Sequence, residues 1–147
     1  MSSNPITTAS IPIQPAEASL LANISGSQTI CQEILTTVVG EFIEAIQQGG
    51  NQFATDGTVP DTVRPHVIAR TRWLWLCEFP EMKRFQTADR SALNTAAEKF
   101  RDHIACGKFK IAPPANPSPS GAIPIVTMPS TGCPKNRHFN WHDENGI

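Results

Sequence analysis

The chain has 147 residues, of which 39% are apolar, 17% are charged and thirteen are proline, with a formal net charge of −1. Both fractions lie below the averages of globular domains, whereas the proline count is high for a compact helical domain, so we expect a folded core with extended ends. No stretch approaches the roughly eighteen apolar residues of a membrane span, and no basic segment followed by an apolar run opens the chain, which excludes a membrane helix and a secretory signal and predicts synthesis in a cytosol.

The charge is unevenly distributed along the chain. Residues 1–60 contain five acidic residues and no Lys or Arg, whereas residues 61–110 contain ten Lys or Arg against six Asp or Glu and so carry +4. Opposite signs on two parts of one chain favour a head-to-tail contact between copies, which is how rings are built. Neutralisation of the two parts within one subunit is the equal alternative.

Residues 1–26 mix Ser, Thr and Ala with three prolines, and their isoleucines follow no helical period. We therefore expect an extended or disordered N-terminal arm. Ile11-Pro12-Ile13 is an alternating apolar pair that would suit an edge strand on a neighbouring copy. A plain flexible terminus is the alternative.

The pattern changes at Ser27, where a first amphipathic helix of about twenty residues is predicted, ending at Gly49-Gly50. Its apolar residues fall on one broad face: Ile34, Leu35, Val38, Val39, Phe42 and Ile46. The acidic side chains of Glu33, Glu41 and Glu44 share the opposite face. This acidic stripe is either solvated or part of a subunit contact.

A second helix is predicted from Thr62, as N-cap, to about Glu78, with Pro65 in its first turn and Pro80 after its end. Its residues Trp73–Cys77 are consecutive apolar residues, and at 100° per residue no single helix face can bury all of them. They are buried on all sides by their own chain, or one side packs on another subunit. We place Trp73 and Trp75 among the candidate contact residues.

A third helix is predicted to begin after Thr87 and to end at Gly107, which suits a left-handed C-cap. Its apolar face consists of Leu93, Ala97, Phe100 and Ile104.

Basic residues accompany these two helices. Lys83 and Arg84 lie between them, and they could form a basic surface together with Arg64, Arg70, Arg72 and Arg90. Such a surface could face nucleic acid, and a DNA-binding packaging or regulatory factor is therefore the alternative function. No helix-turn-helix spacing or aromatic and basic alternation supports specific recognition.

Residues 112–147 contain prolines at high density and no helical period, which predicts an extended strap. Ile123, Ile125 and Met128 supply apolar side chains, while Phe139 and Trp141 are candidate anchors for a partner. An ordinary disordered tail is the alternative.

The sequence gives little support for metal binding or catalysis. Cys133, His138 and His142 have zinc-ligand residue types, but the surrounding prolines and the absence of a second close pair argue against a site. No nucleophile with an oriented base and no pair of carboxylates in a cleft can be recognised. We expect no enzyme activity, no cofactor and no metal.

The segment Thr58–Ile111 resembles the small helical head–tail connector, or adaptor, proteins of tailed bacteriophages. The matching features are a Val59-Pro60 entry, an apolar helix rich in Ala and Arg, a short break, and a helix that opens near Thr87-x-x-Arg90. That helix closes with Ile104-Ala105-Cys106-Gly107-Lys108, which looks like the usual ending in this family before a short extended segment.

The resemblance implies an all-α adaptor that assembles into a ring, usually of twelve copies, beneath the portal vertex of a DNA-filled head. Its partners would be its own copies, the portal protein and the neck or tail completion proteins, with non-specific contact to DNA in the lumen and none to a membrane. Its place would be the neck of the virion, and no catalytic residues are carried over. The long N-terminal arm and the Pro-rich C-terminal arm depart from the simplest members.

The sequence thus predicts an all-α protein in three parts: an N-terminal arm (1–26), a core of three main helices (27–111) and a C-terminal arm (112–147). The residues expected to contact other copies or partners are Glu33, Glu41, Glu44, Arg70, Arg72, Trp73, Trp75, Lys83, Arg84, Phe139 and Trp141.

Overall fold

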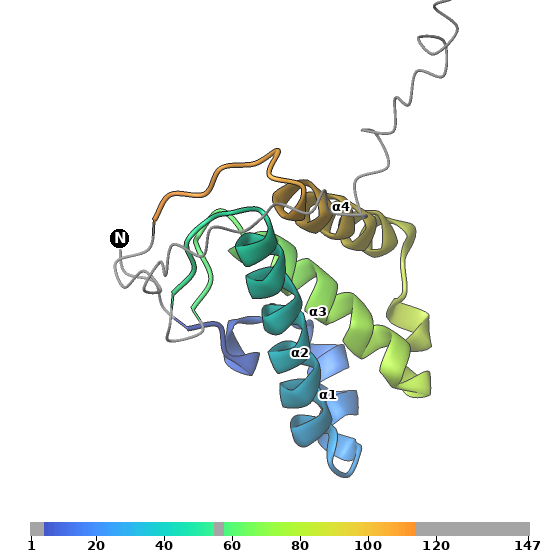
Figure 1. The fold of residues 1–147 in the computed structure, drawn as a ribbon. Coiled ribbons are helices and arrows are strands. Elements are labelled where there is room, and N and C mark those ends of the chain that lie inside the picture. The colour runs from blue at the N-terminus through green and yellow to red at the C-terminus, as the bar shows by residue number, and fades with distance from the viewer. Residues whose placement is uncertain (1–4, 55–57, 114–147) are drawn as a thin grey trace, which may run out of the picture.

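The computed structural model describes residues 5–54 and 58–113, and this part of the chain is helical with no strand. Three long helices, α2 (Ser27–Gln48), α3 (Arg64–Glu78) and α4 (Ala88–Ala105), pack on one another, as the sequence predicted. A shorter helix, α1 (Pro15–Asn23), lies alongside them (Figure 1). Two short 3₁₀ helices, η1 (Thr8–Ser10) and η2 (Pro80–Phe85), complete the fold.

Helix α2 buries one stripe of side chains at spacings of three and four residues, which places them on a single face. Phe42, Val38 and Ile46 have no exposed surface. Burial of a side chain of this size contributes about 1.5–3 kcal/mol. The predicted apolar face of this helix is confirmed, with Ile34 and Val39 only partly buried at its edges.

The end of α2 lies against the end of α4. A Cβ atom placed on Gly49 would be 2.0 Å from the backbone oxygen of Ile104. Gly49 has a φ of −72°, which any residue can adopt, so glycine is required here by space and not by backbone conformation. The sequence predicted this glycine only as a helix stop.

Helix α3 begins later than predicted. Its N-cap is Val63, not Thr62, and Pro65 lies in the first turn, where its missing N–H removes no helical bond. The predicted end at Glu78 is confirmed. Beyond it, Pro80 opens η2, so the break between α3 and α4 is itself a short helix.

Helix α4 has the predicted caps. The side chain of Thr87 accepts a hydrogen bond from Arg90 N at 3.4 Å, and Gly107 adopts a φ of +68°. The predicted apolar face is wrong at Leu93, which is 58% exposed. The neighbouring Asn94 is buried instead, because it accepts a hydrogen bond from Arg70 on α3.

The prediction of an extended arm over residues 1–26 is wrong for Pro15–Asn23, which form α1. Pro15 is the first helical residue, and the backbone N–H of Gln14 donates to Glu17 Oε2 at 3.2 Å, which caps the helix. Leu21 faces the core. Ile11, in the extended segment before α1, is only 2% exposed, so this residue also belongs to the core.

The segment after α4 is fixed by one side chain from the loop after α2. Asn51 Nδ2 donates to the carbonyl oxygen of Phe109 at 3.2 Å, and its Oδ1 accepts from the backbone N–H of Ile111 at 3.1 Å. The Asn51 side-chain amide thus makes hydrogen bonds with these two residues of the kind that a neighbouring β-strand would make. Ile111, the predicted last residue of the core, is 8% exposed, and the predicted C-terminal arm lies outside the described residues except for residues 112–113.

Candidate functional site

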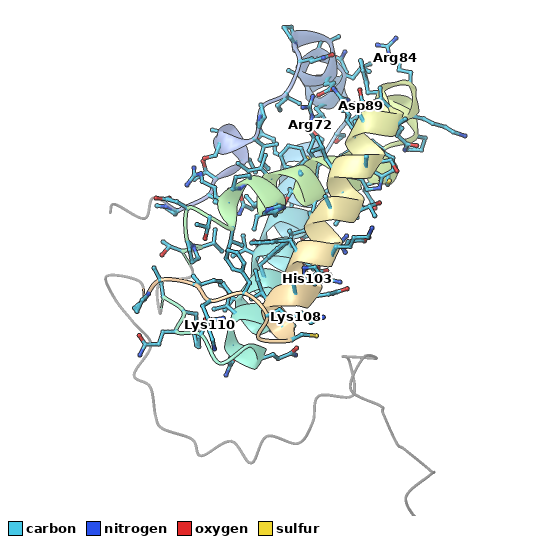
Figure 2. The ribbon with its side chains drawn as sticks, turned by 90° about the horizontal axis from the view of Figure 1, so that it is seen from above. Arg72, Arg84, Asp89, His103, Lys108 and Lys110 are labelled. Carbon is cyan, nitrogen blue, oxygen red and sulfur yellow. The ribbon has the colours of Figure 1, made fainter. Side chains whose placement is uncertain are left out.

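Two networks of ion pairs connect acidic residues of the N-terminal part of the chain with arginines of residues 61–110. The first is centred on Glu17, which is fully buried. Its carboxylate accepts from Arg72 Nη2 at 3.2 and 3.0 Å and pairs with Arg90 Nη1 at 2.5 Å. Figure 2 shows Arg72 near the N-terminal end of α4, beside the N-terminal part of the chain. One carboxylate therefore connects α1 with both α3 and α4.

The second network joins α2, α3 and α4. Arg70 Nε donates to Glu41 Oε2 at 2.9 Å, and its Nη1 donates to Glu98 Oε1 at 2.7 Å. Arg101 Nη1 donates to the same Oε2 of Glu41 at 3.0 Å. Burial alone would lower the pKa of Arg70, but its hydrogen bonds to Glu41 and Glu98 and their charges raise it overall.

The uneven charge predicted either a contact between copies or neutralisation within one subunit. For the residues of these two networks, the structure shows neutralisation within the subunit. Glu17 and Glu41 from the acidic part pair with arginines from the basic part of the same chain. For these residues the neutralisation is internal. Of the proposed contact residues, Glu41, Arg70 and Arg72 thus use their charges inside the subunit.

The remaining charged candidates are on the surface. Glu33 and Glu44 are exposed on α2, and Lys83 and Arg84 are exposed on η2. The Arg84 guanidinium lies 4.8 Å from the ring centroid of Phe85, close enough for a cation–π contact. These four side chains form what we call the exposed charge set.

The two tryptophans of α3 have different surroundings. Trp75 is 2% exposed and its Nε1 donates to the carbonyl oxygen of Cys31 at 3.2 Å, so its own chain encloses it. Trp73 is partly buried against the core. Trp75 is therefore a core residue, and only Trp73 retains surface for an outside contact. Phe139 and Trp141 lie outside the described residues.

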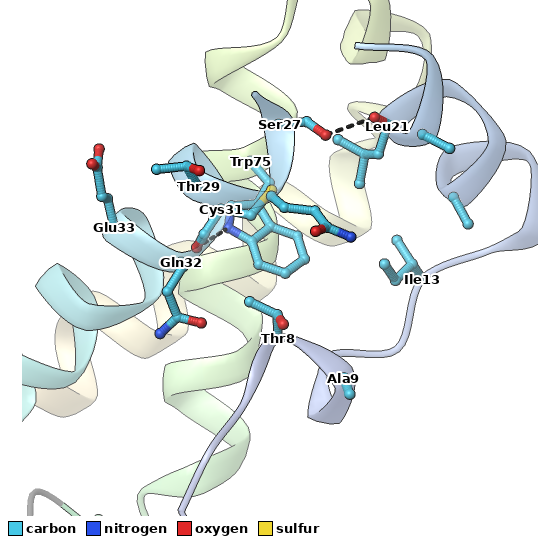
Figure 3. Close-up of a pocket in the computed structure, with 13 residues that line it drawn as sticks. Thr8, Ala9, Ile13, Leu21, Ser27, Thr29, Cys31, Gln32, Glu33 and Trp75 are labelled. Carbon is cyan, nitrogen blue, oxygen red and sulfur yellow. Dashed lines mark hydrogen bonds between the residues drawn. The ribbon is translucent and has the colours of Figure 1, made fainter. Parts of the chain in front are cut away.

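An open apolar groove lies between η1, α1 and the start of α2, with a volume of about 710 Å³. Figure 3 shows Trp75 at its centre, with Thr8 and Ile13 on one side and Thr29 and Gln32 on the other. Small side chains of α1, Ala18 and Ala22, leave the groove hollow. The lining residues are Thr8, Ala9, Ile13, Ala18, Leu21, Ala22, Ser27, Gln28, Thr29, Cys31, Gln32, Glu33 and Trp75.

Burial shifts the pKa values of two side chains near the core. Burial raises the pKa of the Cys31 thiol to about 11, so the thiol stays protonated and unreactive at neutral pH. Burial lowers the pKa of His66, whose ring stacks on Phe100 with centroids 4.0 Å apart. No group of three His, Cys, Asp or Glu side chains that could hold a metal ion is found in residues 5–54 and 58–113. The zinc candidates Cys133, His138 and His142 lie outside that range.

Sequence reasoning missed the groove and the buried Glu17, and it assigned Arg90 to a basic surface and not to an ion pair with Glu17. The signal for α1 was present in Gln14-Pro15-x-Glu17, which has proline at the first helical position and a carboxylate two residues later. The burial of Glu17 has no local signal, because it depends on two arginines far along the chain.

Comparison with protein-family models, curated protein sequences and solved structures finds no match for this chain. Among the described residues, no helix is both long enough and apolar enough to cross a bilayer.

Proposed function

We propose that this chain is a structural assembly protein: a head–tail connector whose copies form a ring between the portal and the tail or neck of a tailed phage. The observation that carries the proposal is the layout of Arg64–Ile111. In this segment Thr87 caps α4 and Gly107, with a φ of +68°, follows its end, and both residues belong to the motifs on which the resemblance rests.

The exposed charge set supports a contact between copies. Glu33 and Glu44 are eleven residues apart on α2, which corresponds to about 16 Å along the helix. Lys83 and Arg84 are on a different element, η2. In a head-to-tail ring, the acidic side of one copy would meet the basic side of the next. Exposed pairs contribute only about 0.2–1 kcal/mol each, so they would orient neighbours more than hold them.

The DNA-binding alternative loses support from the internal ion pairs. Arg70, Arg72, Arg90 and Arg101 all bind carboxylates of their own chain. Figure 2 shows that Lys108 and Lys110 are at the opposite end of α4 from Arg84. The basic side chains are thus dispersed, whereas nucleic-acid-binding proteins gather them on one face.

The proposal is tested by the mass of the full-length protein in solution, measured by native mass spectrometry and light scattering over a range of concentrations. The same measurement is made after mixing with a candidate portal protein. We expect a closed ring, either alone or on the portal. A protein that stays monomeric under all these conditions would contradict the proposal. Tight DNA binding with a steep salt dependence would favour the alternative.

A further inference from the structure

The groove beside α1 has an apolar wall that its neighbours leave partly uncovered. Ile13 forms part of that wall and is 36% exposed, one of the exposed large apolar residues among those described. Leu21 and Trp75 form its base, and both are buried. A concave surface of about 710 Å³ with such a lining is in the size range of ligand-binding sites.

The tripeptide that borders the groove occurs a second time in the chain. Ile11-Pro12-Ile13 is repeated as Ile123-Pro124-Ile125. The first tripeptide, Ile11-Pro12-Ile13, shows how such a sequence packs on this core. Ile11 has the extended dihedral angles φ −89° and ψ 120°, and its side chain is buried, while Ile13 turns to the groove. Proline between the two isoleucines fixes an extended backbone and removes one donor, so little entropy is lost on docking.

The second copy has suitable chemistry for the groove. The chain has no charged side chain between Ile111 and Pro134. Among the described residues that line the groove, Glu33 alone is charged, and it is exposed on α2. Gln28, Thr29 and Gln32 provide amide and hydroxyl groups that can pair with an extended backbone. Binding of this uncharged segment in the groove therefore removes few charged groups from water, so the desolvation cost is small.

The second tripeptide, Ile123-Pro124-Ile125, can also reach the groove of its own subunit. The described chain ends at Pro113, shortly after the Asn51 contacts that fix Phe109 and Ile111. The residues from there to Ile123 can extend over roughly 30 Å, about the diameter of a small domain. Attachment through such a linker gives the tripeptide a local concentration on the order of millimolar at the groove of its own subunit. This favours binding within one subunit over binding to another subunit.

We propose that the groove formed by η1, α1 and the start of α2 binds residues Ala122–Met128 of the same chain. Ile123 and Ile125 fill the space left by Ala18 and Ala22 and cover Ile13. The contact is independent of ring formation, because its occupant comes from the same subunit.

The test places p-benzoylphenylalanine at position 125 of the full-length protein. Irradiation of an equal mixture of ¹⁵N-labelled and unlabelled protein, followed by peptide mass spectrometry, identifies the cross-linked residues and their copy. We expect cross-links to residues of the groove, within one copy. Cross-links spread over the surface, or found mainly between copies, would overturn the proposal.

A matched pair of variants tests whether the groove itself is responsible. Ala22 lines the groove and Ala16 does not, and both are exposed on α1. Ala22→Phe fills the groove and should lower the cross-linking yield about tenfold, whereas Ala16→Phe should leave it unchanged. Circular dichroism melting curves verify that both variants fold. An equal yield in two folded variants would also overturn the proposal.

Discussion

Glu17 Oε1 on α1 and Arg90 Nη1 in the first turn of α4 lie 2.5 Å apart, although the two residues are far apart in the sequence. Glu17 is fully buried, so its charge is compensated by Arg90 and Arg72 and not by water. Such a pair does not by itself make a fold stable, but removal of one partner leaves buried charges uncompensated. The N-terminal helix α1 is therefore held to the core by this buried carboxylate together with the buried Leu21 side chain.

Replacement of Glu17 by Gln should destabilise the protein by about 3 kcal/mol, because two arginines lose their counter-charge. The free energy of unfolding in urea measures the effect. Glu33→Gln is the matched control, since Glu33 is an exposed carboxylate, and should change stability by less than about 0.5 kcal/mol. Equal effects of the two substitutions would contradict the role assigned to Glu17.

Substitution by alanine should change the stability of the protein in opposite directions at Gly40, within α2, and at Gly49, at its end. At Gly49 the new Cβ would meet the Ile104 backbone oxygen at 2.0 Å, so the helices must move apart, at a cost of about 1–3 kcal/mol. At Gly40 nothing lies within 4 Å, and alanine should stabilise α2 by about 0.5–1 kcal/mol. Thermal melting of both variants tests this, and a stabilising Gly49→Ala would show that the two helices are not in close contact.

His66 should make stability depend on pH in the acid range. Because burial lowers the pKa of His66 in the folded state below its usual 6.5, the unfolded chain takes up a proton first as the pH falls. The contribution of His66 is thus fully present above pH 6.5 and is lost as the pH falls through the folded-state pKa. Unfolding curves recorded between neutral and mildly acid pH should show this loss.

His66→Phe is the control for that pH dependence. Phenylalanine preserves the stacking on Phe100 but cannot take up a proton. The variant should lose less stability than the natural protein over the same pH range. If both proteins lose stability equally, the pH dependence comes from carboxylates elsewhere.

The exposed charge set gives a direct test of assembly. Glu33→Lys with Glu44→Lys, or Lys83→Glu with Arg84→Glu, should each weaken the ring, because like charges would then face one another. An equimolar mixture of the two variants should assemble by alternation, and light scattering at low salt would detect it. Assembly that is unaffected by either pair of substitutions would place the contact between copies on another surface.

The three long helices could be predicted because their signals are local. Thr87 and Gly107 mark the ends of α4 by their own backbone preferences, and the apolar spacing of α2 defines its buried face. The helix α1 was missed because its short length and the prolines around it obscure the period. Its helical conformation becomes favourable when Leu21 and Glu17 are buried against the core.

The parts of the candidate surface that could not be predicted depend on contacts between distant residues. Glu41 and Arg70 look like surface residues in the sequence, yet each is bound to the other. Likewise, the five consecutive apolar residues on α3 left two interpretations open, burial by their own chain or a contact with another subunit. For Trp75 the structure shows the first, because residues of η1, α1 and α2 surround it. A pattern along one helix cannot show which other helices will cover it.

The two hydrogen bonds that Asn51 makes with Phe109 and Ile111 determine how a mechanical load would enter the subunit. Tension on the residues that follow would first act on this amide and on the loop at the end of α2. The last turn of α4 would be shielded from unwinding until both bonds had broken. The point where force enters the subunit is therefore set by Asn51, by the buried Ile111 side chain and by the contact of Phe109 with Phe100, and not by the terminus of α4.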